Sequence, residues 1–250
     1  MRKGEKIVRV VALAASEAFV VFTILWLVVR EQYGRLPMAV VTLLLVAAPL
    51  VMERLLGVHI ALPVFIFTLL YAVGPMLGFY YNLYYHVPWW DKMLHIFGGV
   101  AFALLGLFLF EKFADPQRVR RWMTVVFALC LSMAVAVGWE FFEYGMDEIM
   151  KTDMQKDEYV SVIRTVTIDP KQNNNVITID NIAKTIVYDK EGKELVKFDG
   201  YLDIGIKDTM KDLIVNFIGA AVFNIFGFLY LKNKEKHSFV EKIMIKKKEV

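Results

Sequence analysis

Six long stretches of this chain are almost free of charged side chains. Five of them contain no Asp, Glu, Lys or Arg, and the first contains only Glu17. A helix needs about 17 to 25 predominantly apolar residues to cross the hydrocarbon core of a bilayer. The sequence therefore predicts an all-α polytopic membrane protein with six transmembrane helices, at residues 10–29, 36–52, 60–79, 93–110, 122–139 and 213–231.

Composition agrees with a membrane protein and excludes other classes. The chain is 57% hydrophobic and 22% charged, against about 45–50% and about 25% in soluble domains. A net charge of +3 is too small to predict a nucleic-acid partner. One cysteine, Cys130, excludes an internal disulfide and a thiolate metal site. The expected partners are membrane lipids, and no feature of the sequence predicts a protein partner.

Lysine and arginine predict the orientation of the spans. They gather before the first span, between spans four and five, and after the last span. Cytoplasmic loops carry an excess of these residues, and an even number of spans returns the chain to the same side. Both termini of this multi-pass plasma-membrane protein are therefore expected in the cytoplasm. The predicted parts are 1–150 with helices one to five, an extracytoplasmic β-rich insertion at 151–205, helix six at 206–231, and a basic cytoplasmic tail at 232–250.

The predicted insertion is a different kind of sequence. It holds 18 charged residues in 55, with β-rich runs at 159–168, 176–179, 185–188 and 194–198. A turn signal, Asp189-Lys190-Glu191-Gly192, separates the last two runs and predicts a hairpin. Three or four short strands are therefore expected to form one small sheet between helices five and six.

Three of the predicted helices carry polar groups about one turn apart. Residues separated by three or four positions share a helix face. With the predicted orientation, all three polar stripes fall at the outer ends of their spans, so they are expected to form one outer-facing pocket. The stripes are Asp91 with His95, Glu140 with Glu143, and Asp208 with Asp212 and Asn216.

These acids cannot all remain charged and unpaired at low dielectric, because burying each charge costs several kcal/mol. Protonation, pairing with Lys92, Lys207 or Lys211, or a divalent cation would each neutralise them. Oxygen ligands with one imidazole suit magnesium, manganese, iron or zinc. The alternative is that the acids lie at headgroup level and merely cap helices or bind one another. The residues predicted as metal ligands are Asp91, His95, Glu140, Glu143, Asp208 and Asp212.

Three functions follow from these patterns. The first is an outer-facing pocket that binds a cation of unknown identity and a lipid-linked envelope component, with metal-activated water in an enzymatic version. The second is a proton- or cation-coupled transporter, for which Glu17, Asn216 and Asn224 would extend a polar path. The third is a scaffold or sensor that uses the insertion. No familiar nucleophile or phosphate-binding motif is present, so no catalytic residue is assigned.

The three polar pieces also occur in a familiar order. D-K-x-x-H at Asp91, W-E-x-x-E at Trp139 and D-T-x-x-D-x-x-x-N-x-x-G-A at Asp208 resemble the uncharacterised YjdF-like bacterial inner-membrane proteins and, more distantly, the VanZ-like envelope proteins. The resemblance covers spans four to six. It implies an α-helical fold in the bacterial inner membrane, a shared polar site and an envelope role. In those families a short linker joins the second and third pieces, whereas here residues 151–205 intervene.

Overall fold

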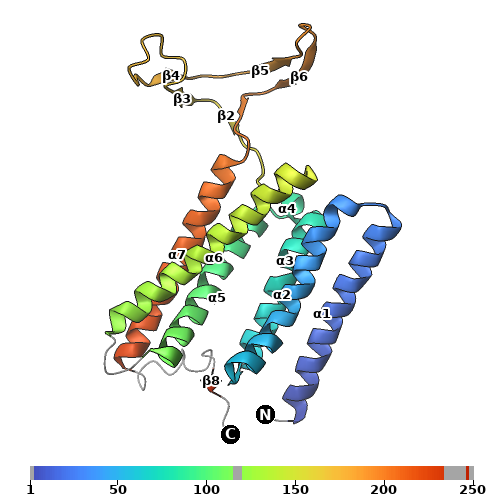
Figure 1. Cartoon of the computed structure of the whole chain (residues 1–250), viewed down its shortest axis with the longest axis vertical. Helices are drawn as coiled ribbons and strands as arrows, with labels where there is room; N and C mark the ends of the chain where they lie inside the picture. The colour runs from blue at the N-terminus through green and yellow to red at the C-terminus, as the bar shows by residue number, and fades with distance from the viewer. Residues whose placement is uncertain (1–2, 115–119, 234–245, 248–250) are drawn as a thin grey trace. The chain divides into compact units, whose positions relative to one another are not determined.

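The computed structural model describes residues 3–114, 120–233 and 246–247. Within these residues, six helices are long and apolar enough to cross a membrane (Figure 1). A 3₁₀ turn, η1 (Tyr33–Arg35), precedes α2, and a short helix, α4 (Leu83–His86), precedes α5. The predicted all-α architecture with six spans is confirmed. The six helices are α1 (Lys3–Val29), α2 (Leu36–Leu56), α3 (Leu62–Tyr80), α5 (Trp90–Phe113), α6 (Arg121–Met150) and α7 (Ile206–Lys232).

The helices extend beyond their charge-free runs. The longest, α6, has 30 residues and is therefore about 45 Å long at 1.5 Å per residue. The hydrocarbon core of a bilayer is only about 30 Å thick. Part of α6 must therefore lie in the headgroup layers or beyond them, where its polar end turns are tolerated.

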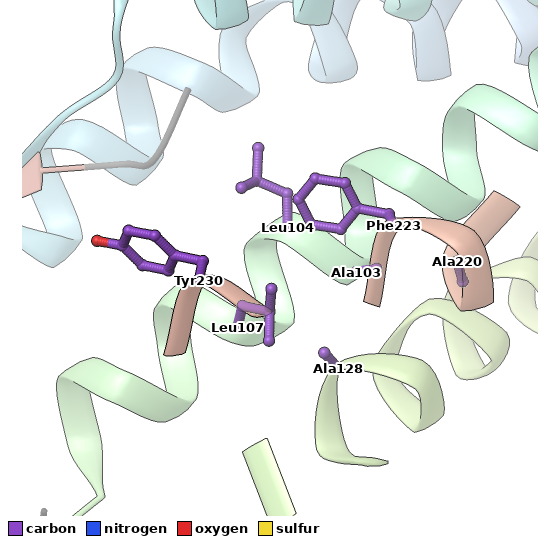
Figure 2. Close-up of a cluster of buried hydrophobic side chains, with 7 residues drawn as sticks. All are labelled: Ala103, Leu104, Leu107, Ala128, Ala220, Phe223 and Tyr230. Carbon is purple, nitrogen blue, oxygen red and sulfur yellow. The ribbon is translucent and has the colours of Figure 1, made fainter. Parts of the chain in front are cut away.

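The chain divides into two compact units. Unit 1 comprises Met1–Phe142 with Asp212–Val250, and unit 2 comprises Glu143–Lys211. In unit 1, α1 packs against α2 and α3, and α3 packs against α5. A buried apolar cluster joins α5, α6 and α7 (Figure 2). Its members are Ala103, Leu104 and Leu107 of α5, Ala128 of α6, and Ala220, Phe223 and Tyr230 of α7.

Glycines bring the backbones of α5 and α7 into contact. A Cβ atom added to Gly99 would lie 2.2 Å from the carbonyl oxygen of Asn216, and one added to Gly219 would lie 2.4 Å from the carbonyl oxygen of Ile96. Small residues at such crossings let membrane helices approach closely, which maximises their van der Waals contact. The crossing lies close to Asp212 of α7 and to Lys92 and His95 of α5, which are in contact.

A buried ion pair connects the beginning of α1 to the α2–α3 connection. Arg9 Nη2 lies 2.6 Å from Glu53 Oε1, and Arg9 Nη1 donates a hydrogen bond of 2.7 Å to the carbonyl of Ile60. The Ile60 amide donates in turn to Glu53 Oε1 at 2.7 Å. His59 is held between Glu5 and Glu53, with its ring nitrogens 3.2 and 3.3 Å from their carboxylates. The cluster fixes three helices at one end of unit 1.

The predicted basic tail lies mostly outside the described residues. Of residues 232–250, the structure describes 232, 233 and 246–247. The last two form β8 (Lys246–Lys247), which pairs antiparallel with β1 (Val58–His59). This ladder brings the end of the chain to the α2–α3 connection.

Unit 2 contains three antiparallel two-stranded ladders rather than the single sheet expected from the sequence. The strands predicted at 176–179, 185–188 and 194–198 and the hairpin at Asp189–Gly192 are confirmed, the first beginning at Ile177. The run predicted at 159–168 forms two short strands, 159–160 and 163–165, and a bend and turn follow at 166–168. The two-residue strand β7 was missed, because so short a segment carries no alternating pattern. The ladders join β2 (Tyr159–Val160) with β7 (Tyr201–Leu202), β3 (Ile163–Thr165) with β4 (Ile177–Ile179), and β5 (Thr185–Tyr188) with β6 (Glu194–Phe198).

Asp203 secures the return of the chain into α7. Its carboxylate accepts backbone hydrogen bonds from Glu158 at 2.7 Å, Lys207 at 2.9 Å and Gly205 at 3.4 Å. Burial opposes ionisation of this carboxyl, but the three N–H donors outweigh it and lower the pKa of Asp203 below its usual value. The ionised form is therefore the one that holds this junction together.

We expect Asp203→Ala to destabilise this junction by about 1 kcal/mol, as for loss of a capping carboxylate. A lowered native pKa means that the stabilisation is complete above the unfolded value of about 3.9 and is lost as the pH falls through the native value. The protection factors of the Glu158 and Lys207 amides, which correct for the intrinsic pH dependence of exchange, should therefore fall below about pH 4 in the wild type. Asp180→Ala, at an exposed position of unit 2, is the control. Equal protection in all three proteins at pH 7 would contradict the prediction.

Candidate metal centre

Four of the six predicted ligands come together in unit 1. Asp91 and His95 lie one turn apart on α5, Glu140 lies on α6 and Asp212 lies in the second turn of α7. All four are buried, with exposed fractions of 8%, 7%, 4% and 1% in that order. These four residues come from three helices and span 122 positions of the sequence, from Asp91 to Asp212. They form one buried polar cluster.

Three of these side chains converge on one point. His95 Nε2 lies 3.8 Å from Asp212 Oδ1 and 4.0 Å from Asp91 Oδ1. One ligand atom from each residue lies within 4.8 Å of the other two. Two atoms that bind one ion at about 2.1 Å each are at most about 4.2 Å apart. Both contacts of the imidazole are therefore within the reach of a single ion. The three atoms together span up to 4.8 Å, so the two carboxylates would close by a few tenths of an ångström around an ion of this size.

Glu140 approaches the other nitrogen of the same imidazole. Its Oε1 atom lies 3.9 Å from His95 Nδ1. Metal-binding histidines usually present their second N–H to a carboxylate or carbonyl, which sets the tautomer and the orientation of the ring. A proton on Nδ1, facing Glu140, would leave Nε2 with its lone pair towards Asp91 and Asp212. The arrangement therefore suits an imidazole ligand with a supporting carboxylate.

Lys92 is the basic group of this cluster. Its Nζ lies 2.8 Å from Asp212 Oδ1 and 3.4 Å from Asp91 Oδ2, and its side chain is 28% exposed. Pairing of the acids with Lys92, one of the expected ways of neutralising them, is confirmed. A divalent cation would place positive charge beside the carboxylates of Asp91, Glu140 and Asp212.

A hydrogen-bonded serine lies below the cluster. Asn216, one turn after Asp212, donates to Ser132 Oγ at 3.4 Å, and Ser132 donates to the carbonyl of Gly99 at 3.1 Å. These bonds connect α7, α6 and α5. Sequence reasoning missed Ser132, although it lies eight residues before Glu140 and so shares its face of α6.

A known protein family matches nearly the whole chain. Residues 12–233 match the model of a family described as "Predicted membrane protein (DUF2238)". The chain belongs to this family. Membership agrees with the resemblance to YjdF-like membrane proteins and extends it from spans four to six to all six helices. No curated protein and no solved structure matches the chain.

Two predicted ligands of this DUF2238 protein, Glu143 and Asp208, belong to unit 2. Both are buried, at 4% and 6% exposure, and Asp208 Oδ2 lies 3.7 Å from Lys156 Nζ. Several carboxylates lie near one another in unit 2: burial raises the pKa of Asp153, and the nearby carboxylates of Asp157, Asp147 and Asp208 raise it further. The pairing of Asp208 with Lys156 had no signal in the sequence, because strands and turns separate the two residues.

The remaining polar positions are placed in unit 1. Glu17 is half-buried on α1, which packs against α2 and α3. Asn224 is 3% exposed, and among the described residues neither polar atom of its side chain has a hydrogen-bond partner. Between Asn216 and Asn224 lies Ala220, which is fully buried. The backbone nitrogen of Ala220 lies 2.9 Å from where a Cβ of Gly99 would be. Tight packing of α5 against α7 therefore separates the side-chain amides of Asn216 and Asn224, which the predicted path would have to connect.

Proposed function

We propose that this DUF2238 protein binds a divalent cation through Asp91, His95 and Asp212, with Glu140 orienting the imidazole. The observation that carries the proposal is the convergence of three buried ligand atoms within 4.8 Å of one another. Two carboxylates and one imidazole suit magnesium, manganese, iron and zinc. The carboxylates of Asp91 and Asp212 provide the electrostatic attraction for the cation.

The bound cation serves to hold an anionic head group of a lipid-linked envelope component. The distribution of Lys and Arg in the sequence supports an orientation in which the beginning of α5, with Asp91 and His95, faces away from the cytoplasm. A lipid reaches such a site laterally from the bilayer. In an enzymatic version, Asp91, His95 and Asp212 would hold the metal, which would polarise a phosphoryl oxygen or activate water, and Glu140 would act as the base.

Metal titration of the purified full chain in lipid nanodiscs tests the proposal. We expect about one Mn²⁺ per chain by electron paramagnetic resonance, and removal of that ion by EDTA. His95→Ala should weaken binding by at least about 100-fold, because loss of even a supporting group costs about 10- to 100-fold. His86→Ala, an exposed histidine on α4, is the control and should bind as the wild type does. Absence of Mn²⁺, Fe²⁺, Zn²⁺ and Mg²⁺ binding to the wild type would overturn the proposal.

The variant Lys92→Met separates a cation site from a self-contained ion-pair cluster. Lys92 competes with an incoming cation for Asp91 and Asp212. If the cluster is a cation site, removing this ammonium raises Mn²⁺ affinity, by about 10-fold for each 1.4 kcal/mol of repulsion relieved. If Lys92 is the permanent counter-ion, Lys92→Met gains no Mn²⁺ affinity and loses thermal stability, which would count against the proposal.

A further inference from the structure

Unit 1 contains an apolar cavity of about 410 Å³ between α2, α3 and α5. Met52 of α2, Phe67 of α3 and Leu105 of α5 contribute to its wall. Leu104 and Phe223 close one side of it. Figure 2 shows the side chains of these two residues pointing to the same side of the buried cluster, away from Ala128. Cavities of about 300 to 1,000 Å³ are typical of small-molecule sites.

The cavity is partly open rather than enclosed, and its apolar walls make it a poor site for water. Its volume equals that of about fourteen water molecules at about 30 Å³ each, and every buried water needs two to four polar partners. Thr68 and Tyr71 provide the only side-chain hydroxyls among its lining residues. The Thr68 hydroxyl already donates to the carbonyl of Val64 at 2.8 Å. The walls come from membrane-spanning helices, so the apolar molecules available to fill the space are hydrocarbon chains.

One wall of the cavity adjoins the metal centre. Tyr71 lines the cavity, and its hydroxyl oxygen lies 2.5 Å from where a Cβ of Gly98 would be. Asn216 Oδ1 lies 3.6 Å from the same position. Gly98 follows His95 by three residues, and Asn216 follows Asp212 by four, so each lies one helical turn from a proposed ligand. The cavity and the cation site are therefore neighbours.

We propose that the cavity holds the hydrocarbon chain of a lipid whose phosphate head group binds to the cation at Asp91, His95 and Asp212. The substrate class is then an alkyl or isoprenyl phosphate, with one chain in the cavity and the phosphate oxygens on the metal. The placement of the head group rests on the proposed function. The placement of the hydrocarbon chain rests on the volume and the apolar walls of the cavity.

Photo-crosslinking tests this inference on the full chain in nanodiscs containing Mn²⁺. The probe is monododecyl phosphate with a diazirine at the end of its chain. We expect cross-links in peptides that line the cavity, including those containing Met52 and Phe67. Ala48→Phe fills the cavity from α2 and should reduce these cross-links by at least tenfold while Mn²⁺ binding is unchanged. Leu44→Phe, one turn earlier and 67% exposed, is the matched control and should cross-link normally.

The outcomes test two parts of the proposal separately: the hydrocarbon chain in the cavity and the head group on the cation. If Ala48→Phe also loses Mn²⁺ binding, Ala101→Leu fills the cavity from α5 and takes its place. Cross-links that survive both fillings would overturn the cavity as the chain site. Cross-links that survive His95→Ala would overturn the link to the cation and indicate an ordinary bilayer lipid. A wild type that cross-links in the cavity but binds no metal would remove the proposed function and leave the hydrocarbon site standing.

Discussion

Gly99→Val is expected to separate α7 from α5 and to abolish cation binding. A Cβ at this position meets the Asn216 carbonyl oxygen at 2.2 Å and the Ala220 amide nitrogen at 2.9 Å. Both are backbone atoms, so no side-chain rotation relieves the clash. We expect a loss of more than about 3 kcal/mol, at the upper limit of overpacking effects. Asp212, four residues before Asn216, would move away from His95. Thermal unfolding in nanodiscs and Mn²⁺ titration measure the two effects.

Gly138→Val is the matched control for this substitution. Gly138 lies in the interior of α6, and a Cβ there would meet no atom within 4 Å. Valine is a better helix former than glycine by a few tenths of a kcal/mol. We therefore expect unchanged or slightly raised stability and unchanged Mn²⁺ binding. Equal losses in the two glycine variants would show that the α5–α7 contact is not what holds the metal centre together.

The second large effect is expected for Arg9→Met. The Arg9 guanidinium is bound to Glu53 and to the carbonyl of Ile60 and lies 4.0 Å from the centre of the Phe65 ring. Removing one partner of a fully buried pair typically costs about 3 to 5 kcal/mol. Glu53 is 17% exposed and keeps its contacts with His59 and the Ile60 amide, so the lower end of this range applies. We expect a loss of this size in thermal unfolding of the full chain, with α1 detaching first.

Arg30→Met provides the comparison for Arg9→Met. Arg30 is exposed just after α1, and the contact seen for its side chain is with Trp26, at 6.0 Å from the ring centre. Its substitution should change stability by less than about 0.5 kcal/mol. The double variant Arg9→Met with Glu53→Met should recover part of the loss, since apolar replacements of buried pairs are often tolerated. Similar losses for Arg9→Met and Arg30→Met would contradict the role assigned to the ion pair.

Much of the buried Asp/His/Glu cluster could be predicted from short sequence spacings. Asp91 and His95 are four residues apart, so any helix through them places both on one face. The predicted orientation brought the start of α7 to the same level. The role of Ser132 and the pairing of Asp208 with Lys156 could not be predicted in this way. Each of these contacts depends on which faces of two distant segments pack together, and a local sequence pattern does not indicate that packing.

The sequence by itself determined the six spans. Charged side chains and unsatisfied backbone groups are costly in hydrocarbon, so the absence of charge marks each helix one segment at a time. Tertiary structure alone decided that Arg9 meets Glu53, that Tyr159–Val160 pairs with Tyr201–Leu202, and that His95 lies between Asp91 and Asp212. The physical reason is that these contacts depend on how closely distant helices and strands approach. At the cluster of Asp91, His95 and Asp212, that approach is set by the bare backbone of Gly99 against α7.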